Sequence, residues 1–160
     1  MGFTLLRPNG FMQNFVTYMG EGIRAGGSFA MPGAEARVSW VDVRDVAAMA
    51  AAALTDPGHA GKAWDLSGPE ALTPGEVASR LSAAAGRAIR HVEVSLDEQL
   101  EGMLAAGIPR WQVDAVVDLS RYYQTGAAAR LSSSVRDVLG RDPIPFDRFA
   151  RDHASFFQHG

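Results

Sequence analysis

The sequence predicts an α/β fold, and three observations support the prediction. Short apolar runs alternate with segments of helical periodicity up to about residue 95, glycine and proline separate the two kinds of segment, and the remainder is almost entirely helical in pattern. We expect a partial sheet of three to four strands in residues 1–95 and a helical cap in residues 96–160. Open sheets usually have about five or six strands, so this sheet is thin.

The first strand and the first helix are predicted in residues 3–23. Residues 3–6 form an apolar run that ends at a proline and a glycine, which favours a buried strand. Apolar residues then recur at helical spacing over residues 11–23, and two glycines follow the pattern as a C-terminal cap. We expect one helix of about four turns here.

Residues 28–41 alternate weakly on both sides of a Pro-Gly pair. This pattern predicts a hairpin-like or looped connection and a short strand at residues 37–41. A helix rich in alanine should follow, because Asp42 can cap its first amides and Asp45 is placed like the acidic partner of a capping box.

The strand-to-helix order is repeated in the second half of the α/β segment. Residues 63–66 are a predicted strand, and Thr73 with Glu76 three positions later predicts the start of a helix. Residues 90–94 alternate like an edge strand, and Ser95 with Glu98 is a second capping box. The helices of the cap are predicted at residues 96–106, 111–125, 133–139 and 145–158.

Composition excludes several classes of function. A chain of 160 residues with 47% hydrophobic content suits one domain. The net charge is only -3 and the arginines are scattered, so nucleic acid is not an expected partner. The lack of cysteine excludes disulfides and thiolate catalysis, and the histidines have no metal-ligand spacing. No apolar run approaches the ~20 residues of a membrane span and no secretion signal is evident, so we expect a cytoplasmic protein without a membrane partner.

Four stretches in a fixed order resemble the C-terminal half of the NmrA-like family: "TLLRPNGFMQNF", "VSWVDVRDVAAMAAAAL", "WDLSGPEALTPGEVASRLSAAAGRAIRHVEVS" and "FDRFARDHASFF". The resemblance runs over essentially the whole chain. This family consists of atypical short-chain dehydrogenase/reductase proteins, among them NAD(P)H-dependent quinone reductases and cofactor-sensing regulators. The resemblance implies that the partial sheet is Rossmann-like.

In that family the N-terminal half contains the glycine-rich phosphate loop, which this sequence lacks. The pair Gly26-Gly27 is followed by Ser28 and has no third glycine opening a helix after a strand. A Tyr-x-x-x-Lys pair is also impossible, because the only lysine, Lys62, has Gly58 four positions before it. We therefore expect NAD(P)H to be the cofactor of the intact family and not to be bound by this chain alone.

Two explanations account for a half-length sequence. The chain is a fragment begun at an internal methionine, Met1, or it is a natural half-protein that covers its open sheet edge by homodimerisation or by docking on a separate Rossmann-half subunit. In either case, leaving a few hundred Å² of apolar surface exposed to water would cost several kcal/mol of stability at roughly 25 cal/mol per Å². We therefore expect an oligomer.

The resemblance places Pro8 and Asn9 at the nicotinamide end of the cofactor, and Asn9, Phe11 and Asn14 beside a small-molecule substrate. Ligands of open α/β sheets lie beyond the carboxyl ends of the strands, which is where Asn9 is expected. The alternatives are that Asn9 belongs to a turn, that Asn14 is a solvated helix residue and that Phe11 is in the core.

Three aromatic residues are candidates for the substrate pocket. These are Trp40, Trp111 and Tyr122, the last two in an aromatic group with Tyr123 on the helical cap, which closes over the substrate in related reductases. Aromatic residues at helical spacing also fill cores, so packing is the alternative. No catalytic residue is assigned, because Asp42 and Asp45 are better explained as capping residues than as an acid/base pair.

The sequence supports three hypotheses of function. The first is the substrate-binding half of an NAD(P)H-dependent oxidoreductase that reduces a quinone or another conjugated carbonyl when intact. The second is a natural truncated, cofactor-independent cyclase, isomerase or lyase of secondary metabolism, which needs a shaped pocket and one or two acid/base groups. The third is a non-catalytic regulatory or partner subunit.

Overall fold

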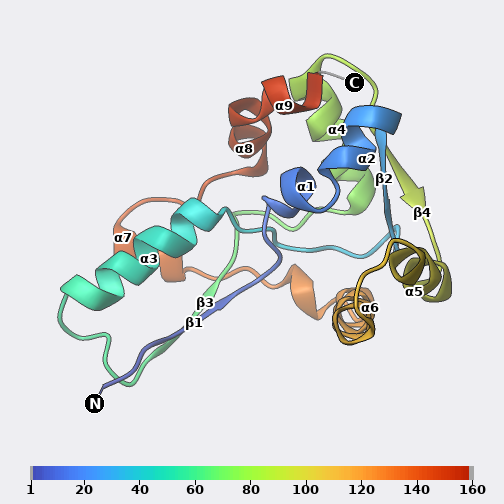
Figure 1. The fold of residues 1–160 in the computed structure, drawn as a ribbon. Coiled ribbons are helices and arrows are strands. Elements are labelled where there is room, and N and C mark those ends of the chain that lie inside the picture. Colours follow the sequence, from blue (N-terminus) through green and yellow to red (C-terminus); the bar gives the residue numbers. More distant parts are fainter. Residues whose placement is uncertain (1, 159–160) are drawn as a thin grey trace.

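The fold was analysed in a computed structural model that describes residues 2–158. Met1, which the sequence marks as a possible internal start, lies outside this range. The predicted α/β class is confirmed: short parallel strands are surrounded by helices, and the C-terminal part of the chain is helical (Figure 1).

The strands form two separate pairs. Strand β1 (Leu5–Pro8) runs parallel to β3 (Ala63–Leu66), and β2 (Ser28–Met31) runs parallel to β4 (Arg90–Glu93). The described residues therefore contain two small sheets in place of one sheet of three to four strands. The pairs are splayed apart in Figure 1, with β1 and β3 at one side of the molecule and β2 and β4 at the other.

Of the hairpin-like or looped connection expected over residues 28–41, the structure contains the loop, and β2 pairs instead with a strand some sixty positions away. Two left-handed glycines explain the pairing. Gly27 ends the helix before β2 with φ 62°, and Gly86 ends the helix before β4 with φ 68°. The amide of Arg90 then donates to the carbonyl of Gly27 at 2.9 Å and starts the parallel ladder.

The expected four-turn helix is split into α1 (Asn14–Thr17) and α2 (Gly20–Gly26). The break has a packing reason at Gly20. A side chain there would lie 2.7 Å from a ring carbon of Phe156, so only glycine allows α2 to start against that ring.

Helices α3 (Val43–Thr55) and α4 (Pro74–Ala85) start where the sequence predicts. The α4 capping box is complete, because the Thr73 hydroxyl accepts from the Glu76 amide and the Glu76 carboxylate accepts from the Thr73 amide. The strand expected at residues 37–41 is reduced to isolated bridges, Phe11 to Val41 and Val38 to Leu72.

The remaining helices follow the predicted order. They are α5 (Leu96–Ala105), α6 (Arg110–Gln124), the short 3-10 helix η1 (Ala127–Ala129), α7 (Ser134–Leu139), α8 (Phe146–Asp152) and α9 (Ala154–Gln158). Helices α5 and α6 pack against each other, α8 and α9 pack on α4, and α7 packs on α3 (Figure 1).

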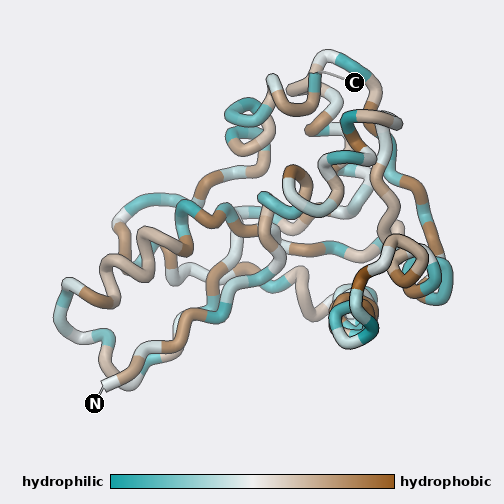
Figure 2. The backbone as a smooth tube through the Cα atoms, viewed as in Figure 1, coloured by the Kyte–Doolittle hydropathy of each residue, from teal (hydrophilic) through white to brown (hydrophobic). Residues whose placement is uncertain are grey.

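Two hydrophobic clusters hold these elements together. The larger cluster is centred on Phe15, whose ring makes edge-on contacts with Phe29, Trp40 and Phe146 at centroid distances of 5.3, 5.0 and 5.6 Å. It joins residues on both sides of position 95 into one core. The smaller cluster contains the buried residues Val41, Met49, Leu66 and Val135, between β1, β3, α3 and α7. Figure 2 shows hydrophobic positions along β1 as well as in the helices of the larger cluster.

Candidate functional site

An open cavity of about 1500 Å³ lies at the carboxyl ends of the strands. Pro8 and Asn9 at the end of β1, Ser67 after β3 and Met31 at the end of β2 all line it. Helices α5 and α6 and residues 127–133 form the opposite wall. Ligands of open α/β folds bind at this edge, where loops expose polar groups beyond the strands. A smaller hollow of about 330 Å³ lies beside Gly33, in the loop after β2.

The Asn9 side chain is engaged within the protein. Its amide nitrogen donates to the Ser39 hydroxyl at 2.7 Å and to the Ala128 carbonyl at 2.8 Å, and its oxygen accepts from the Gly10 amide at 2.9 Å. Both N–H donors are used, and only the second lone pair of the oxygen is left. Asn9 therefore ties the end of β1 to η1 and shapes the cavity wall.

Gly10 allows two aromatic side chains to approach the backbone at the end of β1. A β-carbon on Gly10 would lie 2.6 Å from the Trp40 ring and 2.8 Å from the Tyr123 hydroxyl oxygen. The two rings meet edge to face at a centroid distance of 5.8 Å, and both line the cavity. Any larger residue at position 10 would displace one of them.

Ser67 lines the cavity after β3, and Gly68 packs behind it against Trp40. The Ser67 hydroxyl accepts from the Ser132 amide at 2.8 Å and thereby holds the segment before α7. A side chain on Gly68 would overlap the Trp40 carbonyl oxygen, so a glycine is required at this position too.

The cavity brings together most of the residues that the sequence singles out. Pro8, Asn9, Phe11, Asn14, Trp40 and Tyr122 line it. Trp111 does not, and its side chain is 74% exposed. These positions are consistent with cofactor and substrate roles, and the roles themselves stay predictions.

Tyr123 is a cavity residue that the sequence interpretation passed over in favour of Tyr122. The α6 residues that line the cavity include Gln112, Val116, Ser120 and Tyr123, which recur every three or four positions along one face. Trp111 lies outside that face. The helical period measured from Gln112 is therefore the signal that could have identified Tyr123.

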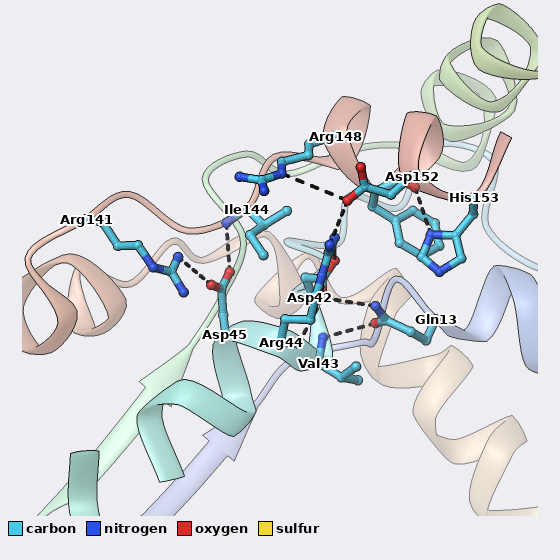
Figure 3. Close-up of polar contacts among 11 residues, drawn as sticks. Gln13, Asp42, Val43, Arg44, Asp45, Arg141, Ile144, Arg148, Asp152 and His153 are labelled. Atoms are coloured by element: carbon cyan, nitrogen blue, oxygen red, sulfur yellow. Dashed lines mark hydrogen bonds and ion pairs between the residues drawn. The ribbon is translucent and has the colours of Figure 1, made fainter. Parts of the chain in front are cut away.

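Asp42 is a buried helix cap and forms an ion pair with the half-exposed Arg44 (Figure 3). Its carboxylate accepts from the Arg44 amide at 2.9 Å and pairs with the Arg44 guanidinium at 2.7 Å, and Arg44 reaches Asp152 on α8 at 2.6 Å. Burial by itself would raise the pKa of Asp42, but the hydrogen bonds from Arg44 outweigh burial and hold the pKa below its ordinary value.

Asp45 does not complete a capping box, so that expectation is wrong. Its carboxylate accepts from the Ile144 amide at 2.7 Å and pairs with Arg141 at 2.7 Å (Figure 3). Arg7, near the end of β1, pairs with Asp65 at 2.8 Å. Both buried aspartates join α3 to the C-terminal segment, and neither lines the cavity.

Residues 2–158 contain no cluster of three or more histidine, aspartate or glutamate side chains that could hold a metal ion. In the same part of the chain, no helix combines the length and the apolar character that crossing a membrane requires.

Comparison with known proteins identifies relatives over nearly the whole chain. The model of the NmrA-like family matches residues 3–139. The chain is 41% identical over 157 residues to an NAD(P)H azoreductase of Xenophilus azovorans, covering 98% of the chain and 54% of that relative. It is 37% identical to a (4-alkanoyl-5-oxo-2,5-dihydrofuran-3-yl)methyl phosphate reductase of Streptomyces griseus, covering 97% of the chain and 54% of that relative.

Solved structures agree at the level of the fold. An NADPH-dependent quinone oxidoreductase of Escherichia coli superposes with a TM-score of 0.84 at 20% identity, over 95% of this chain and 55% of that one. The chain thus spans about half the length of the curated relatives that it matches.

Proposed function

The chain belongs to the NmrA-like family, and we propose that it forms the substrate-side half of an NAD(P)H-dependent oxidoreductase. The observation on which this proposal rests is the cavity at the carboxyl ends of the parallel strands, walled by Trp40, Tyr122 and Tyr123. Aromatic walls suit a flat, conjugated substrate, and we propose a quinone or a related conjugated carbonyl.

The residues present fit one end of a dinucleotide. Pro8 with Asn9, at the end of β1, would form the wall against the nicotinamide, and Gly10 lets the Trp40 and Tyr123 rings line the cavity beside them. The sequence contains no glycine-rich loop for the pyrophosphate. When bound, the reduced nicotinamide supplies a hydride, while the residues of this chain hold the substrate flat and limit its contact with water.

We propose that the pyrophosphate site comes from a second polypeptide segment at the open edge of β1. The amides of Leu5 and Asn9 donate to β3, and among residues 2–158 no strand pairs with the other edge of β1. An unpaired parallel edge is a template for a further strand. A separate Rossmann-half subunit could supply both this strand and the phosphate loop. A second copy of this chain could cover the edge of β1, but it would bring no glycine-rich loop.

Calorimetric titration of the purified chain tests the proposal. NADPH alone should show no micromolar affinity, whereas 1,4-naphthoquinone should bind in the cavity. A variant with Ser120 replaced by tryptophan, which would fill the cavity from α6, should lose the quinone, and the matched change Ser79→Trp on the exposed face of α4 should not. Tight binding of NADPH by the isolated chain would contradict the division into halves.

A second outcome bears on the cofactor-independent alternative. If the chain alone converts an enolisable cyclic ketone without any nicotinamide, the cavity serves an isomerase or lyase, and the reductase proposal fails. The buried Tyr123 hydroxyl in the cavity wall is the observation that favours testing this reaction.

A further inference from the structure

Tyr123 is the most deeply buried tyrosine of the chain and lies in the last turn of α6. Only 5% of its surface is exposed, yet it lines the cavity. Its hydroxyl lies next to Gly10, at the carboxyl end of β1, where a β-carbon on Gly10 would be 2.8 Å from the oxygen. The phenol therefore enters the cavity wall at the place where the strand ends.

The hydroxyl has no hydrogen-bond partner in the part of the chain that the structure describes. Asn9, which precedes Gly10, bonds to Ser39 and to Ala128 of η1, and Ser39 also bonds to Ala128. The Trp40 indole N–H is also unpartnered but is sealed from solvent, so it cannot reach a molecule in the cavity. The Tyr123 oxygen is not sealed in this way, so an unpartnered phenol in the cavity wall is open to a ligand.

We propose that the Tyr123 hydroxyl is the hydrogen-bond donor for the carbonyl oxygen of a planar, conjugated substrate held against the Trp40 side of the cavity. This inference rests on the proposed function and deepens it by naming the group that polarises the acceptor. As electron density moves onto the carbonyl oxygen, a fixed donor stabilises the developing charge. No proton leaves Tyr123 in this role.

The electrostatics agree with a neutral donor. Burial, and to a smaller extent the neighbouring Tyr122, raise the pKa of Tyr123 to about 12. The phenol therefore keeps its proton throughout the physiological range. The other titratable groups in the cavity wall are Arg7, Tyr18, Asp65, Glu98, Tyr122 and Arg130.

Tyr122 supplies a matched control from the adjacent position. It lines the same cavity, but its side chain is 48% exposed, so water satisfies its hydroxyl without a ligand. Removing the Tyr123 hydroxyl should therefore weaken a ligand that has a carbonyl more than removing the Tyr122 hydroxyl does.

The experiment compares two probes of one shape, 1,4-naphthoquinone and naphthalene, in wild type, Tyr123→Phe and Tyr122→Phe. The chain has no cysteine, so thiol addition to the quinone does not interfere. We expect Tyr123→Phe to weaken binding of the quinone about tenfold or slightly less and to leave naphthalene unchanged, as the loss of one hydrogen bond requires. Tyr122→Phe keeps its ring in the cavity wall and should weaken binding of the quinone less than Tyr123→Phe does.

The infrared carbonyl stretch of the bound quinone is a second readout that packing alone would not move. It should lie at lower wavenumber in wild type than in Tyr123→Phe. Equal loss of affinity for both probes, or an unchanged stretch, would overturn the donor role and leave the proposed function standing. If wild type binds neither probe, the cavity is not a substrate site and both proposals fail.

Discussion

The two hydrophobic clusters differ in what surrounds them. The larger cluster, centred on Phe15, is covered by α1, α2, α4, α8 and α9, and its aromatic side chains Phe15, Phe146 and Phe149 are fully buried. The four buried members of the smaller cluster are at most 1% exposed as well, but among residues 2–158 no strand pairs with the outer edge of β1 beside them. The chain thus encloses both cores, and the smaller one borders an unpaired strand edge.

A second apolar surface lies on α3, which packs beside the smaller cluster. Val43, Ala47, Ala51 and Leu54 recur along one face of this helix and are exposed, Leu54 to 87%. Exposed apolar faces of this kind often mark an interaction surface. Helix α3 also contacts β1, the strand at whose edge we propose a second polypeptide segment.

The largest loss of stability is expected from a substitution inside the larger cluster. Phe146→Ala should lower the free energy of unfolding by about 4 kcal/mol, because removing this fully buried aromatic ring leaves a cavity in the core. Chemical denaturation followed by circular dichroism measures the loss. The matched change Phe3→Ala, at a ring that is 62% exposed, should cost less than about 1 kcal/mol. Equal losses would mean that the larger cluster is not the stabilising core.

An intermediate effect is expected at the junction of the two clusters. Asp42 caps α3, and Arg44 links it to α8. Asp42→Asn leaves the half-exposed Arg44 without its buried partner and should destabilise the protein by about 2 kcal/mol at pH 7.

The sign of the pH dependence follows from the lowered pKa of Asp42. The stabilising contribution of this carboxylate is complete above the ordinary value of 3.8 and is lost as pH falls through the lower folded value. Urea midpoints of wild type and Asp42→Asn should therefore converge below about pH 4. The control Asp65→Asn, in an exposed pair with Arg7, should cost at most about 0.5 kcal/mol at any pH. A constant gap down to pH 2 would contradict the role of the charge.

The smallest effect on stability is expected on the apolar face of α3. Leu54→Glu should change the free energy of unfolding by less than about 0.5 kcal/mol, because the side chain is exposed. It should instead reduce association of the chain in sedimentation at micromolar concentration, where we expect the wild type to dimerise. Ser79→Glu on α4 is the control. A monomeric wild type would leave only a separate subunit as the occupant of this face.

The sequence correctly predicted the features that depend on residues close together in the chain. The Thr73–Glu76 and Ser95–Glu98 capping boxes and the cap at Asp42 are all present. Each depends on hydrogen bonds between groups within about four positions, which any such chain can form locally. The family resemblance is confirmed as well, because it rests on the order of several such motifs.

Other features depended on residues far apart in the chain. Asp45 has the spacing of a capping box, yet its partners are Arg141 and Ile144, which only the packing of the tail onto α3 supplies. The four-turn helix was divided because Phe156 occupies the space beside Gly20. Apolar spacing cannot reveal a neighbour that is more than a hundred positions away.

By itself the sequence determined the α/β class, the starts of the capped helices and the lack of a phosphate loop, because these depend on short-range chemistry and on which residue types are present. Only the tertiary structure decided that β2 pairs with β4, that Tyr123 and not Trp111 enters the cavity, and that β1 keeps an open edge. Pairing and enclosure require groups that distant segments bring together, and their positions are set by how the whole chain packs.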